Sequence, residues 1–135
     1  MPAKPLQENR MNSNKFSLKS RIGSFKFAFR GLWSLLKNEH NSRIHFLAAI
    51  VAIALGLILK INPYEWSLLI IVIGIVFLTE LLNSSLETLA DIVDPDWNER
   101  IRKAKDYAAA AVLISAIIAV VAGGLIFIPK FLALI

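Results

Sequence analysis

The sequence contains no cysteine among its 135 residues, which excludes disulfide-stabilised folds and thiolate chemistry. It has no glycine-rich phosphate loop of the form G-x-x-x-x-G-K-S/T and no G-x-S-x-G nucleophile elbow. Its two histidines, His40 and His45, do not have the H-E-x-x-H spacing of zinc proteases. The motifs of P-loop nucleotide-binding proteins, serine hydrolases and zinc proteases are therefore missing from this sequence.

Charge is also missing from long stretches of the chain. Residues 44–59 and 107–128 contain no Asp, Glu, Lys or Arg, and no Lys or Arg occurs between Lys60 and Arg100. Apolar residues make up 56% of the chain, against about 45–50% in soluble domains, and the mean hydropathy is +0.60. A chain this short cannot bury so much apolar surface in its own core, so we expect an integral membrane protein.

Three apolar stretches predict three membrane-spanning helices, at about 43–60, 64–91 and 104–128. A bilayer core requires about 20 helical residues. The second stretch is uninterrupted only from Trp66 to Leu78, which is too short to span a bilayer by itself. Its polar half, from Thr79 onward, is therefore expected at or near membrane depth.

The segment before the first span predicts an amphipathic surface helix over about 21–40. Apolar and aromatic residues recur there at helical spacing, and Lys26, Arg30 and Lys37 follow one flank. A basic amphipathic helix with aromatic side chains is typical of the membrane interface; a helix packed on a soluble partner is the alternative. Residues 1–20 are polar and show no apolar period, so we expect a disordered N-terminal extension.

The distribution of positive charge predicts the orientation of the chain. Nine of the fifteen Lys and Arg residues precede the first span, and four more lie between the second and third spans. Only Lys60 and Lys130 lie on the other side. The positive-inside rule then places the N-terminus and the 91–106 loop in the cytoplasm and the C-terminus outside.

The polar half of the second span carries three carboxylates on one face. Counted from Glu80, the residues Asn83, Ser84, Glu87 and Asp91 follow at positions 3, 4, 7 and 11, which places all five within roughly a 100° sector of a helix. A charged residue at membrane depth costs about 2.5–3.5 kcal/mol on insertion scales. Because this helix has no Lys or Arg of its own, the partners must come from another helix, another subunit or a bound cation.

Three hypotheses fit this acidic face. Carboxylates bind hard cations such as Mg²⁺, often together with substrate phosphates, and Glu39, Arg43, Lys105 and Asp106 are expected at the same cytoplasmic level. This combination beside a lipid phase favours phosphoryl transfer from a nucleotide to a lipid alcohol. An ion or proton pathway lined by the acids is the main alternative, and a polar seam that only sets assembly is the other.

The segment 80–87 (ELLNSSLE), followed by Asp91, resembles the signature of the small bacterial diacylglycerol kinase family. The segment 104–106 (AKD) with the alanines after it resembles the second motif of that family, and segments 24–31 and 38–45 resemble its amphipathic helix and the junction that follows. The resemblance covers about residues 24–127. It implies a homotrimeric, all-α protein of the bacterial cytoplasmic (inner) membrane, whose active sites are shared between subunits and use ATP and Mg²⁺.

The resemblance also implies roles for individual residues. Glu80 would be the catalytic base at the lipid hydroxyl, supported by Asn83. Glu39 and Glu87 would hold the metal that bridges the ATP phosphates. The nucleotide-side residues would be Phe27, Glu39, Glu87, Asp96, Asn98, Lys105 and Asp106, and the lipid-side residues would be Trp33, Arg43, Glu80, Asn83 and Ala109.

Two residues after Arg43 bear on the lipid substrate. The chain has Ile44 and His45 where the diacylglycerol-specific enterobacterial members of the family have a polar-acidic pair. This pattern resembles the undecaprenol kinases of Gram-positive bacteria, which favours a polyprenol over diacylglycerol as the acceptor. The alternative role for His45 is that of a plain interface residue whose side chain reaches toward the headgroups.

Overall fold

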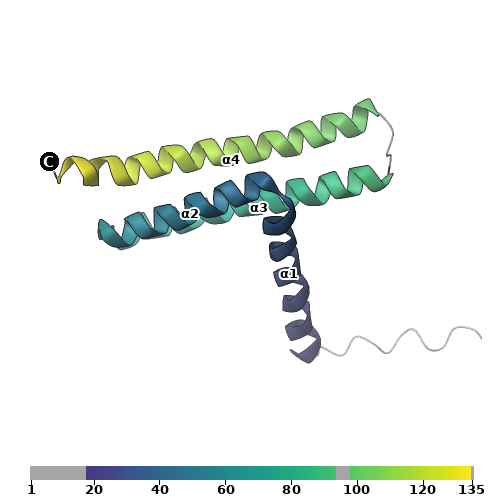
Figure 1. The fold of residues 1–135 in the computed structure, drawn as a ribbon, viewed down its shortest axis with the longest axis horizontal. Helices are drawn as coiled ribbons and strands as arrows, with labels where there is room; N and C mark the ends of the chain where they lie inside the picture. The colour runs from purple at the N-terminus through teal and green to yellow at the C-terminus, as the bar shows by residue number, and fades with distance from the viewer. Residues whose placement is uncertain (1–17, 94–97, 135) are drawn as a thin grey trace, which may run out of the picture. The chain divides into compact units, whose positions relative to one another are not determined.

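The computed structural model describes residues 18–93 and 98–134, which form four helices (Figure 1). These are α1 (Leu18–Asn38), α2 (His40–Ile58), α3 (Pro63–Val93) and α4 (Glu99–Leu132). The described residues contain no strand, so the predicted all-α fold is confirmed. Residues 1–17 of the predicted N-terminal extension lie outside the described residues, whereas residues 18–20 begin α1.

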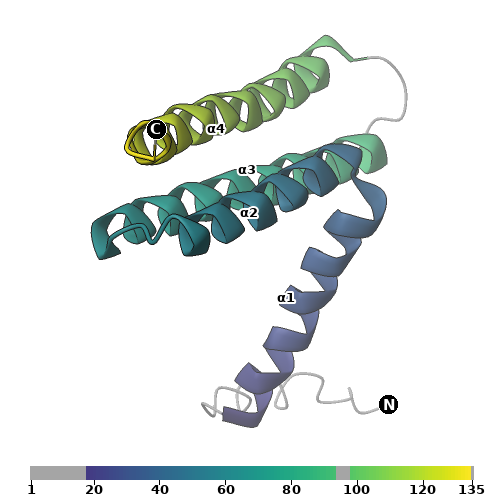
Figure 2. The same cartoon turned by 60° about the vertical axis from the view of Figure 1, so that its left-hand side comes forward.

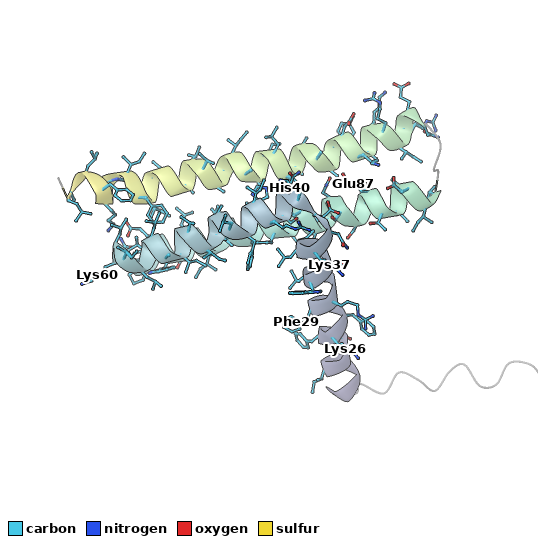
Figure 3. All side chains as sticks on the ribbon, in the orientation of Figure 1. Lys26, Phe29, Lys37, His40, Lys60 and Glu87 are labelled. Carbon is cyan, nitrogen blue, oxygen red and sulfur yellow. The ribbon has the colours of Figure 1, made fainter. Side chains whose placement is uncertain are left out.

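The chain divides into two compact units, residues 1–30 and residues 31–135. The described part of the first unit is the N-terminal portion of α1, which exposes Phe25 and Phe29 and carries Lys26 (Figure 3). The Arg30 guanidinium lies 5.4 Å from the centroid of the Phe27 ring, within the range of a cation–π contact. This part of α1 therefore has the mixed basic and aromatic surface that is typical of interfacial helices.

In the second unit, α2, α3 and α4 lie side by side, and α3 runs antiparallel to the other two (Figures 1 and 2). Each of the three is long and apolar enough to cross a membrane. Large apolar side chains such as Leu57, Ile70 and Val120 are exposed on their outer surfaces. These findings confirm the three predicted membrane helices and fit a chain whose solvent is lipid.

The α2–α3 connection is fixed by a reciprocal cap. Asn62 Oδ1 accepts hydrogen bonds from the backbone N–H groups of Tyr64 and Glu65, at 2.9 and 3.0 Å. Glu65 Oε2 accepts one of 2.6 Å from the backbone N–H of Asn62, and Pro63 occupies the first helical position. This is the capping-box arrangement, and it sets the start of α3.

The last helix is longer than its predicted span of 104–128. Asn98 Oδ1 accepts hydrogen bonds from the backbone N–H groups of Arg100 and Ile101, so α4 begins at Glu99, in polar sequence ahead of the apolar run. At its other end α4 continues through Pro129 to Leu132. The apolar pattern marks the membrane-embedded part of the helix, whereas capping chemistry decides where the helix starts.

Apolar packing is concentrated at the end of the bundle opposite the polar half of α3. Ile61, Leu69, Ile126 and Phe127 form a buried cluster there. Lys130 Nζ lies 3.2 Å from Glu65 Oε2 and joins α4 to α3 beside that cluster. The apolar cluster and the Lys130–Glu65 pair thus hold the helices together at one end of the bundle. The polar residues of α3 lie toward the other end.

Candidate active site in the polar half of α3

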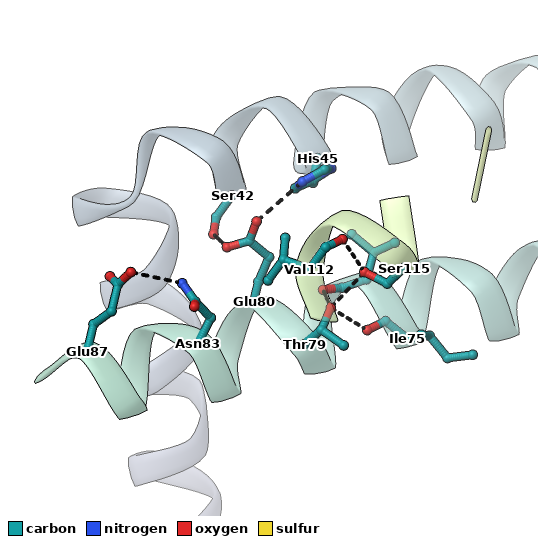
Figure 4. Close-up of polar contacts among 10 residues, drawn as sticks. Ser42, His45, Ile75, Thr79, Glu80, Asn83, Glu87, Val112 and Ser115 are labelled. Carbon is teal, nitrogen blue, oxygen red and sulfur yellow. Dashed lines mark hydrogen bonds and ion pairs between the residues drawn. The ribbon is translucent and has the colours of Figure 1, made fainter. Parts of the chain in front are cut away.

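Glu80 is buried where α3 meets α2, with only 3% of the residue exposed (Figure 4). Ser42 Oγ donates a hydrogen bond of 2.9 Å to Glu80 Oε2. Glu80 Oε1 lies 3.3 Å from His45 Nε2, within ion-pair distance, but it accepts no hydrogen bond from the described residues. The carboxylate is therefore anchored through one oxygen and keeps the other available.

Both partners of Glu80 come from the first turn and a half of α2. Ser42 and His45 are three residues apart, so they lie on the same face of the helix. Ser42 is completely buried, whereas 23% of the His45 side chain is exposed. The sequence predicted that the carboxylates find partners outside their own helix, and Glu80 confirms this.

A hydroxyl pair fixes α3 against α4 immediately before Glu80. Thr79 Oγ1 and Ser115 Oγ are 2.8 Å apart, and either hydroxyl can donate (Figure 4). Ser115 is buried, and its hydroxyl also lies 2.8 Å from the carbonyl oxygen of Val112, to which it donates when Thr79 is the donor of the pair. Glu80 is thus placed between two interhelical polar contacts, one to α2 and one to α4.

Asn83 and Glu87 form the next layer along α3. Asn83 Nδ2 donates to Glu87 Oε1 at 3.3 Å, and both side chains are half-buried (Figure 4). The amide oxygen of Asn83 is buried and accepts no hydrogen bond from the described residues. Asn83 therefore contacts the proposed metal ligand Glu87; its predicted support of Glu80 does not occur as a direct hydrogen bond.

Asp91, the third carboxylate of the acidic face, contacts α4. Lys105 Nζ lies 3.0 Å from Asp91 Oδ1, and Asp106 pairs within its own helix with Arg102 at 2.7 Å. Glu80, Glu87 and Asp91 share one sector of α3, as the spacing predicts, yet each contacts a different group. The face is divided into a buried acid, a half-buried acid and an exposed, neutralised one.

Glu39 stands at the junction between α1 and α2. Its backbone is extended, with φ −98° and ψ 120°, and this single residue interrupts the helical chain. A pocket of about 230 Å³ lies beside it. The polar side chains on its wall are Ser34, Asn38 and Glu39 on one side and Ser84, Ser85 and Thr88 of α3 on the other.

Arg43 has a structural role that the sequence did not reveal. Its Nε donates to the carbonyl oxygen of Leu36 at 2.9 Å, and its Nη2 donates to that of Lys37. These carbonyls belong to the last turn of α1, where backbone acceptors lack helical partners. The guanidinium that was predicted to face the lipid substrate therefore caps α1 and stabilises the junction at Glu39.

The remaining predicted site residues come from several separate segments of the chain. Trp33 is 70% exposed, and Ala109 is exposed on α4. Phe27 belongs to the first unit, Asn98 is the N-cap of α4, and Asp96 lies outside the described residues. Conversely, Ser42 and the Thr79–Ser115 pair were missed by sequence reasoning, because a hydroxyl beside an apolar run gives no indication of its partner.

The side chains in this region suit a hard cation in part. Glu39 and Glu87 are half-buried carboxylates, and Asn83, whose amide nitrogen contacts Glu87, has a buried amide oxygen that accepts no hydrogen bond from the described residues. Mg²⁺ prefers such oxygen ligands and usually takes the rest from water and substrate phosphates. Within residues 18–93 and 98–134, no group of three or more acidic or imidazole side chains forms a complete metal cage.

The fold and the site together define a class: an all-helical integral membrane protein with a buried acidic site at one end of its helix bundle. The family model for prokaryotic diacylglycerol kinase matches residues 26–127. The chain is 33% identical over 124 residues to the undecaprenol kinase of Bacillus subtilis (strain 168), covering 92% of this chain and 97% of that one.

Two diacylglycerol kinases are similarly related to the chain. That of Synechocystis sp. is 34% identical over 112 residues, covering 82% of this chain and 64% of that protein. That of Haemophilus influenzae is 36% identical over 107 residues, covering 78% of this chain and 91% of that protein.

The chain belongs to the prokaryotic diacylglycerol kinase family. It is a lipid kinase, an enzyme that transfers a phosphoryl group from ATP to a lipid, and this supports the first hypothesis over the ion-pathway and assembly alternatives.

Proposed function

We propose that this enzyme phosphorylates a membrane lipid alcohol, undecaprenol in preference to diacylglycerol, with Mg²⁺ and ATP at the cytoplasmic face of the bacterial inner membrane. The observation that carries the mechanism is the buried Glu80 carboxylate, which has one oxygen held by Ser42 and the other without a hydrogen bond. A carboxylate in that state, on a membrane helix, can accept a proton from a hydroxyl delivered by the lipid phase.

The reaction follows from the depth of the two acids in α3. Glu80 and Glu87 are seven residues apart, about 10 Å along the helix axis. The lipid hydroxyl approaches the deeper Glu80, and the nucleotide approaches the shallower Glu87. The hydroxyl oxygen bonds to the γ-phosphorus as the bond from that phosphorus to the β–γ bridging oxygen breaks. ADP leaves, and the hydroxyl proton passes to the Glu80 carboxylate.

Positioning and charge neutralisation supply most of the catalysis in phosphoryl transfer. Glu39 and Glu87 are the residues that would hold Mg²⁺, which neutralises charge on phosphate oxygens when bound. Lys105 is the nearby cation for the nucleotide; its present partner Asp91 is exposed, so phosphate oxygens can compete for the ammonium. Asp106, Asn98, Asp96 and Phe27 complete the proposed nucleotide side, and Trp33, Arg43 and Ala109 the proposed lipid side.

The preference for undecaprenol rests on two observations. The relative that the chain matches over 97% of its length is named an undecaprenol kinase. His45, the residue that suggested a polyprenol substrate, lies against the proposed base. We further propose that the N-terminus is cytoplasmic, the C-terminus is external, and the enzyme works as a homotrimer with shared active sites.

A turnover assay on both lipid alcohols tests this proposal. Purified protein in mixed micelles with Mg-ATP should transfer labelled phosphate to undecaprenol faster than to diacylglycerol, and EDTA should abolish both activities. The empty micelle is the background control. Faster transfer to diacylglycerol would overturn the substrate preference, and no transfer to either alcohol would overturn the proposed function.

A further inference from the structure

The two oxygens of the Glu80 carboxylate face two different side chains of α2, one turn apart. Ser42 Oγ holds Oε2 at 2.9 Å, and His45 Nε2 lies 3.3 Å from Oε1 (Figure 4). Either charge state of an imidazole can present an N–H at Nε2, whereas a hydroxyl can donate only one hydrogen. This geometry distinguishes the two oxygens, one tied to a buried hydroxyl and one adjacent to a ring nitrogen.

We propose that Ser42 and His45 act as a clamp that orients the Glu80 carboxylate, with Oε1 as the atom that accepts the proton of the lipid hydroxyl. Both are positioning residues, since they act through Glu80. The inference rests on the proposed function, in which Glu80 is the base. It adds to that function the identity of the accepting oxygen and of the residues that aim it.

The need for a clamp follows from the side chain itself. A glutamate has three rotatable side-chain bonds, and Glu80 must keep one oxygen within hydrogen-bond reach of a hydroxyl that arrives from lipid. Ser42 is completely buried and pairs with only one oxygen. The Ser42 hydrogen bond fixes Oε2 alone; in the clamp, the His45 ring, whose Nε2 lies 3.3 Å from Oε1, limits rotation of the carboxylate about that bond.

The position of the His45 ring also connects the clamp to the lipid side. His45 lines an apolar groove of about 210 Å³ between α2, α3 and α4, together with Ala52, Val76 and Ala116. The ring is therefore in contact with Glu80 while forming part of the wall of this groove. An alcohol whose chain enters the groove would present its hydroxyl beside Oε1, the oxygen that accepts no hydrogen bond.

The clamp is tested by substitutions that separate the ring nitrogen from the bulk of the ring. His45→Phe keeps a planar ring and removes Nε2; His45→Gln places an amide N–H near the same point. Leu47→Phe is the matched control, because it introduces the same side chain at an exposed position two residues further on in α2. For each variant, kcat and the KM values for Mg-ATP and the lipid are measured together with the thermal unfolding midpoint.

The clamp predicts that His45→Phe lowers kcat by about tenfold or more, the scale on which small misplacements act. It also predicts an unchanged KM for Mg-ATP and an unchanged unfolding midpoint. His45→Gln should recover most of the lost kcat, and Leu47→Phe should resemble the wild type. Ser42→Ala, which removes a buried hydroxyl without adding volume, should also lower kcat, and it serves as the second probe should His45→Phe fail to fold.

The outcomes separate this inference from the proposed function. Glu80→Gln is assayed in parallel. If Glu80→Gln is inactive but His45→Phe and Ser42→Ala keep the wild-type kcat, the clamp is wrong and the base assignment stands. If His45→Gln is as slow as His45→Phe, the ring nitrogen is not the orienting group and the clamp is again wrong. If Glu80→Gln keeps near-full activity, the proposed base itself is wrong.

Discussion

At the scale of single residues, Glu80 shows how a carboxylate is accommodated inside a bundle of long apolar helices. Breaking a buried polar pair is costly because the remaining group keeps its charge without its partner. Here the partners are the hydroxyl of Ser42 and the imidazole of His45, both supplied by α2. The carboxylate is half-paired, because Oε1 accepts no hydrogen bond from the described residues. This fits a group kept for chemistry, since a purely structural carboxylate would normally have both oxygens satisfied.

Gly56 is a second residue whose role follows directly from geometry. A Cβ atom built there would lie 2.9 Å from Trp66 Cη2 and 3.0 Å from Ile61 Cδ1. We therefore expect Gly56→Ala to destabilise the α2–α3 turn by about 1–3 kcal/mol through overpacking. Thermal unfolding in detergent measures this, with Gly23→Ala as the control, since nothing lies within 4 Å of a Cβ at that position.

A double variant makes this prediction sharper. Trp66→Phe removes the indole atoms that the new methyl group would meet, so Gly56→Ala should cost less in that background than in the wild type. An unfolding midpoint for Gly56→Ala equal to that of the wild type would contradict the packing account.

At the scale of elements, α4 illustrates how polar capping and apolar length act separately. The apolar run of 107–128 decides which part of α4 lies in lipid, while Asn98 decides where the helix begins. Arg43 caps the C-terminal end of α1 by donating hydrogen bonds to its last carbonyl oxygens. These capping contacts hold the segments that flank the acidic site, namely the Glu39 junction and the first turn of α4, which precedes Lys105.

The cap at Asn98 can be tested by stability alone. Asn98→Ala should lower the free energy of unfolding by about 1 kcal/mol, because two backbone N–H groups lose their acceptor. Asn98→Asp keeps a side-chain oxygen in place and should retain most of the stability. If both variants are equally destabilised in thermal unfolding, the loss does not come from the cap.

At the scale of the whole molecule, the sequence predicted the parts that depend on local pattern. Helix length and the absence of charge define three spans, and helical spacing brings Glu80, Glu87 and Asp91 onto one sector of α3. The partners of these acids were not predictable, since Ser42 is 38 residues from Glu80 and Lys105 is 14 residues from Asp91. Such contacts depend on how helices pack, and no periodicity within one helix encodes that.

The difference between patterns within one helix and contacts between helices also explains which predicted site residues the structure brings together. The local motif of α3 was recognisable, and its deepest acid is indeed buried in the bundle. Arg43 and Asn98 were predicted as ligand contacts, which remain predictions, and the folded chain shows that their side chains also satisfy helix ends. Family motifs mark such positions for attention, but only the folded chain shows whether a polar side chain already has a partner.

The central claim is that Glu80 takes the proton of the lipid hydroxyl during phosphoryl transfer. Glu80→Gln keeps the shape and the Ser42 contact but removes the basic oxygen, so it tests this claim most directly. In the micelle assay with Mg-ATP and undecaprenol, we expect kcat to fall by about 100-fold or more, with the unfolding midpoint and assembly state preserved. A Glu80→Gln enzyme that folds normally and turns over at close to the wild-type rate would contradict the account.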